Sequence, residues 1–227
     1  MYIDFTYILV LIGAGLSMLA SANVSSTFQK YNGVYANSRK KAEEVALHIL
    51  QSAGIYDVRI ERVAGSLTDH YSPNEKVLRL SESVYGSSSI AAIGVAAHEC
   101  GHAIQHQTNY GPLKLRSLSV PLANIGSKLS WPLILLGLVL GFTGLATIGI
   151  WLFAFVVFFQ LITLPVEFNA SNRAMQVLER DSILYGNELK GARSVLNAAA
   201  LTYVAALVSS LLQLLRLILI TRNNRRN

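Results

Sequence analysis

The chain has 227 residues, of which 52% are hydrophobic and only 14% charged, with a formal net charge of +6. This composition is too apolar for an ordinary soluble domain and indicates a membrane protein with a modest soluble portion. Cys100 is the only cysteine, which excludes an intrachain disulfide. The basic residues flank apolar segments and are not interleaved with aromatic residues, so we expect no nucleic-acid partner.

Three apolar stretches are long enough to be tested as membrane spans. Residues 5–22 carry no charge, residues 119–165 carry one lysine and residues 194–220 carry one arginine. Crossing the hydrocarbon core takes about 20 apolar residues in a helix. Residues 119–165 divide near Gly141 into two halves of about that length. We therefore expect four spans.

The first span could instead be a signal peptide, because Ala20-Ser21-Ala22 resembles a cleavage site. The residues before it include Asp4 and no lysine or arginine, which favours an uncleaved anchor. Basic residues follow the first span and precede the second, so the positive-inside rule places residues 24–118 in the cytoplasm and the N-terminus outside. Four spans would also place the basic tail outside. Either the tail is an exception or the last apolar segment does not cross.

The region between the first two spans predicts a mixed unit of helices and strands. Residues 38–53 have apolar residues at helical spacing, and residues 58–63 partly alternate as in a half-exposed strand. Residues 65–75 are rich in turn formers, and residues 76–80 predict another short strand. A long helix is expected from Ser87 to about Asn109. The soluble part is therefore an α+β unit of about 90 residues, large enough for a core.

The long helix contains the sequence HECGH, which has the HExxH spacing of a zinc site. Residues four apart lie on one face of a helix, so His98 and His102 can bind one ion. Glu99 then lies beside the metal, where it can accept a proton from a zinc-bound water. The alternative is an ordinary helix with hydrogen-bonded surface histidines. Small residues around the motif leave room for a site and favour zinc: Ala96, Ala97, Gly101 and Ala103.

His106 continues the histidine spacing, but it lies eight residues after His98, about 12 Å along a continuous helix. Nothing in Ala103-Ile104-Gln105 forces the helix to turn, so we expect His106 on the helix surface or behind the ligands. Acids after the motif offer a third ligand: Glu167, Glu179, Asp181 and Glu188.

Glu167 is the favoured third ligand among these acids. It follows Pro165 at the end of the third span, where the chain returns to the side of the HExxH helix. An ionisable residue at that depth needs a partner, and a cation supplies one. The alternative is an interfacial carboxylate paired with Arg173 or Arg116.

Several segments together resemble the YugP-type bacterial membrane zinc metallopeptidases. These are LTDHYSPNEKVLRLSESVY, IAAIGVAAHECGHAIQHQ and LPVEFNASNRA, and the similarity covers nearly the whole chain. The resemblance implies a neutral zinc peptidase fixed in the cytoplasmic membrane. The chain is more distantly similar to the HtpX-like gluzincins, which implies that His98, His102 and Glu167 bind Zn²⁺ and that Glu99 is the general base.

The resemblance also implies the overall organisation, a small cytoplasmic zincin-like α+β domain with an HExxH helix and about four transmembrane helices. The expected parts are an anchor (1–23), a catalytic domain (24–118), a transmembrane hairpin (119–165), a return segment with the third ligand (166–193), and a last transmembrane helix with a basic tail (194–227).

The expected reaction is hydrolysis of peptide bonds by a zinc-activated water, with Glu99 as general base. A developing oxyanion needs a further donor, for which the candidates are His70, Tyr71, Tyr110 and Asn172. Gluzincins have an aspartate four residues after the glutamate ligand, where this chain has Ser171. Ser171, Asn172 or a backbone carbonyl must therefore accept the outer N–H of a zinc histidine.

Three other classes of protein fit the sequence less well. A non-catalytic zinc-binding membrane scaffold would not need Glu99. An intramembrane protease would bury the motif in a span, but only Ile90–Ala97 is continuously apolar before it. A transporter or channel would have more ionisable residues within its spans. The expected partners are the lipid bilayer and a membrane-associated protein or peptide substrate. The sequence specifies neither the substrate nor the oligomeric state.

Overall fold

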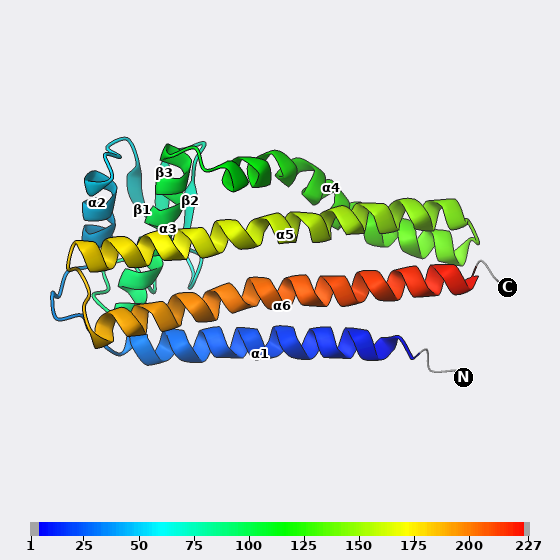
Figure 1. Ribbon diagram of the computed structural model, residues 1–227, viewed down its shortest axis with the longest axis horizontal. Coiled ribbons are helices and arrows are strands. Elements are labelled where there is room, and N and C mark those ends of the chain that lie inside the picture. Colours follow the sequence, from blue (N-terminus) through cyan, green and yellow to red (C-terminus); the bar gives the residue numbers. More distant parts are fainter. Residues whose placement is uncertain (1–4, 225–227) are drawn as a thin grey trace. The chain divides into compact units, whose positions relative to one another are not determined.

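The computed structural model describes residues 5–224, which form six helices and one small sheet (Figure 1). The described elements are α1 (Tyr7–Asn32), α2 (Ala42–Ser52), β1 (Arg59–Val63), β2 (His70–Ser72), β3 (Val77–Ser81), α3 (Ile90–Gln107), α4 (Gly111–Val139), α5 (Thr143–Arg180) and α6 (Asn187–Asn224). The described residues form two compact units. The first comprises residues 5–21, 114–165 and 201–224, and the second comprises residues 22–113 and 166–200.

Four helices, α1, α4, α5 and α6, are long and apolar enough to cross a membrane. Within their most apolar stretches, only 11–28% of the residues are buried inside the protein. Such exposed apolar surface is stable in lipid and not in water. Helices α5 and α6 each have 38 residues, well beyond the 20 or so that a bilayer requires. Each therefore continues beyond the hydrocarbon core.

The sheet has the strand order β1-β3-β2, with β3 in the centre. Strand β1 is parallel to β3 and β2 is antiparallel to it, with Ile60 and Tyr71 both opposite Leu78. Strand β2 lies within residues 65–75, which were expected to be rich in turns, and the sequence did not predict it. Turn formers flank this three-residue strand, and pairing with β3 gives its backbone the hydrogen bonds that local sequence does not specify.

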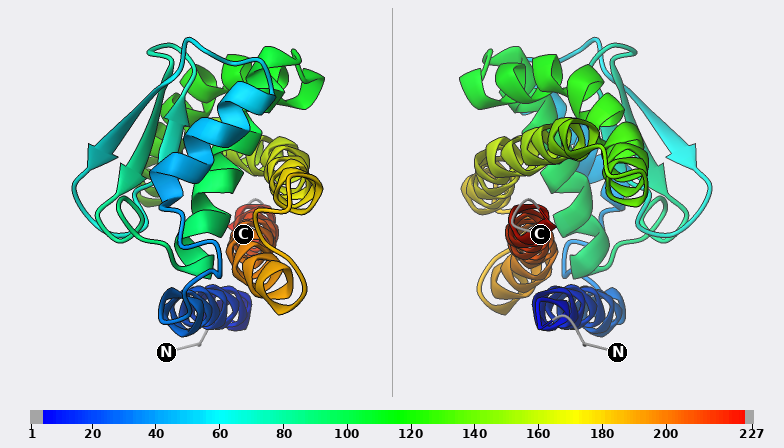
Figure 2. Two further views of the ribbon diagram at one scale, coloured as in Figure 1. Left: turned by 90° about the vertical axis from the view of Figure 1, so that its left-hand side faces the viewer. Right: turned by 90° about the vertical axis from the view of Figure 1, so that its right-hand side faces the viewer.

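The core of the second unit lies where α2 and the sheet pack beside α3 (Figures 1 and 2). The expected apolar face of α2 is buried, as Ile49 and Leu50 show, and β3 contributes Leu78 and Leu80. Burying one such side chain stabilises a fold by about 1.5–3 kcal/mol. This packing fixes α3, the helix that carries the HExxH motif.

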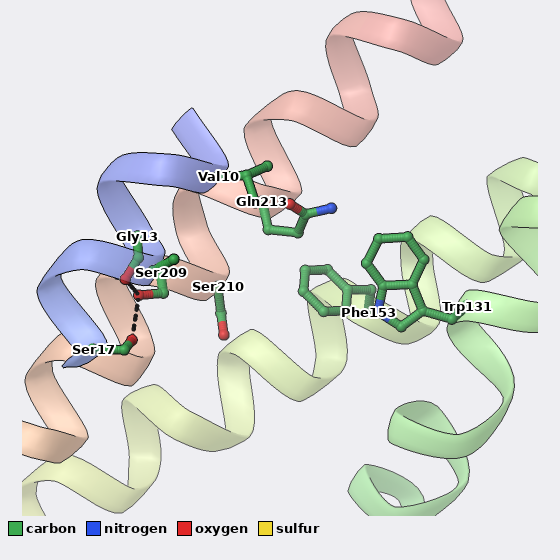
Figure 3. Close-up of a pocket in the computed structure, with 9 residues that line it drawn as sticks. Val10, Gly13, Ser17, Trp131, Phe153, Ser209, Ser210 and Gln213 are labelled. Atoms are coloured by element: carbon green, nitrogen blue, oxygen red, sulfur yellow. Dashed lines mark hydrogen bonds between the residues drawn. The ribbon is translucent and has the colours of Figure 1, made fainter. Parts of the chain in front are cut away.

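In the first unit, small residues allow close contact between helices, as is common in membranes. A Cβ at Gly137 would lie only 2.3 Å from the backbone nitrogen of Ala146, so α4 and α5 meet closely there. Ser209 on α6 donates a hydrogen bond of 2.7 Å to the carbonyl of Gly13 on α1. A pocket of about 300 Å³ lies beside this contact (Figure 3), lined among others by Val10, Ser17, Trp131, Phe153, Ser209 and Gln213.

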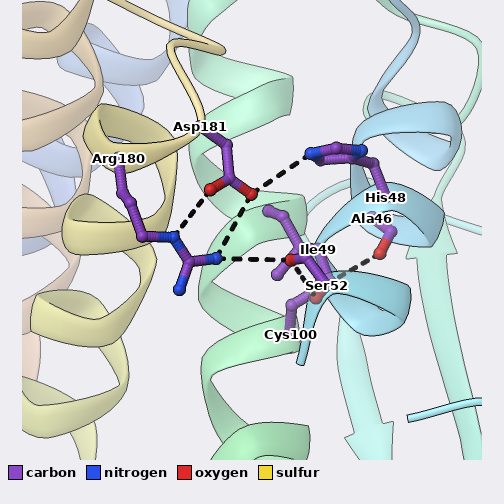
Figure 4. A network of polar contacts seen from close by, with 7 residues as sticks. All are labelled: Ala46, His48, Ile49, Ser52, Cys100, Arg180 and Asp181. Carbon is purple, nitrogen blue, oxygen red and sulfur yellow. Dashed lines mark hydrogen bonds and ion pairs between the residues drawn. The ribbon is translucent and has the colours of Figure 1, made fainter. Parts of the chain in front are cut away.

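A polar network joins the end of α5 to α2 in the second unit (Figure 4). The Asp181 carboxylate accepts a hydrogen bond of 2.7 Å from Nε of Arg180 and lies 3.1 Å from Nε2 of His48. Arg180 also donates to the hydroxyl of Ser52, at 3.4 Å. The hydrogen bond from Arg180, with its charge and that of His48, holds the pKa of Asp181 below its ordinary value.

The lowered pKa of Asp181 predicts a pH-dependent contribution to stability. We expect Asp181→Asn to destabilise the protein at pH 7 by about 1 kcal/mol, the usual value of one such hydrogen bond. The contribution is present above the unfolded-state pKa of about 3.9 and is lost as the pH falls through the lower folded-state pKa. Unfolding in detergent micelles, followed by circular dichroism between pH 7 and pH 3, measures the difference. Glu179→Gln, which removes an exposed carboxylate from α5, is the matched control; an equal effect of both substitutions would contradict the prediction.

Candidate metal centre

Helix α3 presents the two histidines of the motif on one face. The helix begins after Ser89, whose hydroxyl accepts a hydrogen bond of 3.1 Å from the backbone N–H of Ala92, and it continues without a break to Gln107. His98 and His102 therefore lie one turn apart, with ring centroids 4.8 Å from each other and ring planes at 87°. Residues of one helix supply both imidazoles, as the spacing predicts.

Glu167 on α5 completes a cluster of three possible metal ligands. Its Oε2 atom lies 3.3 Å from Nε2 of His98 and 3.6 Å from Nε2 of His102. One possible ligand atom from each residue lies within 4.8 Å of the other two. The side chain of Glu167 is only 4% exposed, and its Oε2 has no hydrogen-bond donor among the described residues. A buried carboxylate oxygen without a donor, facing two imidazole nitrogens, fits a bound cation.

Gly101 allows α3 and α5 to approach closely enough for these residues to meet. It lies between the two histidines, and a Cβ at this position would be 2.4 Å from the carbonyl oxygen of Ala170. A real Cβ cannot approach a backbone atom so closely, so any larger residue would push the two helices apart. Glycine at this position therefore brings Glu167 within reach of His98 and His102.

Each histidine has a hydrogen-bond partner at its outer nitrogen. Nδ1 of His98 lies 3.1 Å from the hydroxyl of Ser171, and Nδ1 of His102 lies 3.0 Å from Oε1 of Gln105. Ser171 was one of the expected partners. Gln105 was not expected, although a polar residue three positions after a ligand on the same helix is a signal that could have identified it.

The charges around the cluster favour a cation. Burial of the His102 imidazole opposes its charged form, but contact with Glu167 and the negative charge of Glu99 outweigh this effect. The pKa of His102 is consequently raised above its ordinary value. Glu99 is itself buried on α3, next to His98. The same two carboxylates, Glu167 and Glu99, that favour a proton on His102 would also favour a metal cation.

The remaining predicted residues form separate contacts. The hydroxyl of Tyr71 on β2 is 2.9 Å from Nδ1 of His106, which is exposed at the end of α3. His70 is also exposed, and its Nδ1 is 2.9 Å from the carbonyl of Thr68. Asn172 is exposed on α5. The guanidinium carbon of Arg173 lies over the ring of Tyr110, 5.8 Å from the centroid of that ring. The structure thus brings His98, His102, Glu167 and Ser171 together and pairs His106 with Tyr71.

Two comparisons with known proteins match nearly the whole chain. The family model described as "Putative neutral zinc metallopeptidase" matches residues 6–222. The chain belongs to this family. It is 50% identical over 217 residues to the "Putative membrane protease YugP" of Bacillus subtilis (strain 168), and the alignment covers 96% of each chain. No solved structure matches the chain.

Family membership and the four apolar helices together establish the class of the protein. It is a multi-pass membrane protein of α+β composition in a zinc peptidase family. The family implies Zn²⁺ as the metal, and the cluster of His98, His102 and Glu167 is the possible site.

The three clustered residues predict the metal content of variants. We expect about one zinc per chain in purified wild type and a marked loss in Glu167→Ala, because two imidazoles alone hold zinc weakly. Elemental analysis after gel filtration measures the ratio. His106→Ala is the matched control and should keep its zinc, since His106 contacts Tyr71 and lies outside the cluster. Zinc that depends on His106 and not on Glu167 would contradict this ligand set.

The contact at Gly101 predicts a second effect on the same centre. Gly101→Ala should destabilise the protein, because overpacking costs about 1–3 kcal/mol while the gain in helix propensity is at most about 1 kcal/mol. It should also weaken zinc binding by separating α3 from α5. Thermal unfolding and zinc titration test both effects. Gly15→Ala on α1, where a Cβ would meet nothing within 4 Å, should be neutral or slightly stabilising.

Proposed function

We propose that this protein is a membrane-anchored zinc metallopeptidase that hydrolyses peptide bonds. In this proposal His98, His102 and Glu167 bind Zn²⁺ and Glu99 is the general base. The observation that carries it is the convergence, from two different helices, of two imidazole nitrogens and one buried carboxylate oxygen that has no hydrogen bond among the described residues.

The number of ligands favours a catalytic zinc over a structural one. Structural zinc sites usually have four protein ligands, whereas catalytic sites have three and leave one position open. The described residues offer three in this cluster. Cys100 lies between His98 and His102 in sequence but is fully buried, and its thiol donates a hydrogen bond to the carbonyl of Ala46. Burial raises the pKa of that thiol. It is therefore a core residue and not a fourth ligand.

The chemistry divides between the metal and the side chains around it. Bound zinc would act as a Lewis acid. It would polarise the scissile carbonyl and would activate a water molecule for attack. Glu99 accepts the proton of the attacking water and transfers it to the leaving amine. Glu99 is buried on α3 and directly follows His98 in sequence. Ser171 and Gln105 hold the imidazoles in place.

The membrane location supports a substrate class and an orientation. Anchoring raises the local concentration of proteins and peptides near the bilayer, so we propose membrane-associated substrates. The basic residues near both ends of residues 24–118 support a cytoplasmic catalytic domain, zincin-like in its helix and sheet, with residues 119–165 as a transmembrane hairpin. On this topology residues 166–193 return the third ligand to the cytoplasmic side.

Substitution of Glu99 tests the proposal. Glu99→Gln should keep its zinc but lose peptide hydrolysis by about 10²–10⁴-fold, the usual contribution of a general base. New peptide termini, detected by mass spectrometry after incubation of reconstituted protein with a peptide mixture, measure the activity. Glu179→Gln, an exposed acid near the end of α5, is the control for the loss of one carboxylate.

The same experiment separates the proposal from its main alternative, a non-catalytic zinc-binding scaffold. A scaffold would bind zinc in wild type and in Glu99→Gln and would release no peptides in either form. Wild-type hydrolysis that survives Glu99→Gln would exclude Glu99 as the base.

A further inference from the structure

Gln105 is a buried polar residue whose type the HExxH motif does not require. It lies on α3, three residues after His102, and its side chain is fully buried. A buried amide is costly unless its donors and acceptor are satisfied. Here the amide makes three hydrogen bonds, and each of them leads to the metal centre or to the adjoining part of α5.

The orientation of this amide follows from its partners. Nε2 of Gln105 donates to the backbone carbonyl of Val166 at 2.8 Å and to Oδ1 of Asn169 at 3.0 Å. The backbone carbonyl of Val166 can only accept a hydrogen bond. Oδ1 of Asn169 is identified as the oxygen because Nε of Arg173, which can only donate, lies 2.8 Å from it. The amide nitrogen must therefore face α5, and the amide oxygen must face His102.

This orientation determines the tautomer of His102. Oε1 of Gln105 is 3.0 Å from Nδ1 of His102 and can only accept a hydrogen bond. Nδ1 must therefore carry the proton, which leaves the lone pair of Nε2 directed into the cluster with Glu167. A histidine can bind a metal through Nε2 only when that nitrogen carries no proton.

Gln105 also holds the third ligand in position. Val166, whose carbonyl accepts from Gln105, directly precedes Glu167 on α5. One side chain thus connects the ring of one ligand to the backbone beside another. We propose that Gln105 is a positioning residue that fixes both the tautomer of His102 and the distance between His102 and Glu167. The inference rests on the ligand set of the proposed function, and it adds a residue that the zinc motif does not contain.

The first test is the zinc affinity of Gln105→Met, which has a similar volume but no hydrogen-bonding groups. Zinc affinity, measured by competition with a chelator on the full-length protein in micelles, should fall about 10–100-fold, the usual effect of losing a group that supports a metal ligand. The matched control is Gln107→Met, the same substitution at an exposed position of α3. Equal zinc affinity in the two variants would overturn the proposal, whatever their melting temperatures.

The second test does not require any variant at Gln105 to fold. In metal-free wild type labelled with ¹⁵N-histidine, the ¹⁵N chemical shifts of neutral His102 should show the proton on Nδ1. A histidine side chain free in water prefers the proton on Nε2, so this result identifies a tautomer imposed by the protein. A neutral His102 with its proton on Nε2 would overturn the proposal. His102→Ala assigns the signals.

The outcomes also separate this inference from the proposed function. Gln105→Met that loses peptide hydrolysis but binds zinc as tightly as wild type overturns the positioning role and leaves the peptidase intact. Normal zinc binding and the Nδ1–H tautomer in a wild type that cleaves no peptide support the positioning role and contradict the peptidase.

Discussion

The close approach of α3 and α5 at Gly101 is the constraint on which the metal centre depends. A Cβ at Gly101 would lie 2.4 Å from the carbonyl oxygen of Ala170, so the two helices can pack at this distance only because a hydrogen occupies that position. His98 and His102 lie on either side of this contact, and Glu167 faces them from α5. Glu167 lies on α5, which is one of the four helices long and apolar enough to cross a membrane.

The polar groups around the cluster have hydrogen-bond partners, whereas one oxygen at its centre has none in the part of the chain that the structure describes. Gln105 satisfies the outer nitrogen of His102, Ser171 lies beside that of His98, and Asn169 links Gln105 to Arg173. The buried Oε2 of Glu167 is left without a donor among the described residues. Unsatisfied buried oxygens are rare in folded proteins because each costs free energy, and a bound ion is one way in which such an oxygen is satisfied. Polar groups that are satisfied at the periphery and unsatisfied at the centre are what a metal site requires.

The parts predicted correctly from the sequence are those in which the chemistry is local. The membrane spans depend on length and hydropathy, α2 and α3 on apolar spacing, and the pairing of His98 with His102 on a separation of four residues. Glu167 required one further step, the return of the chain through a hairpin. Strand β2 was missed because three residues between turn formers carry too little periodicity, and its pairing with β3 provides the missing information. Gln105 was missed because its function depends on Val166 and Asn169, about 60 residues away in sequence.

The sequence by itself determined the class of protein, the HExxH motif and the candidate ligands. These follow from composition, hydropathy and helical spacing, which can be read without knowing which distant residues meet. The tertiary structure alone decided how close Glu167 lies to the two histidines and which groups orient their rings. These choices depend on how closely two helices approach, and that distance is set by a single glycine against a backbone carbonyl on another helix. The sequence shows that residue 101 is a glycine. Only the fold brings the carbonyl oxygen of Ala170 so close to it that no side chain fits.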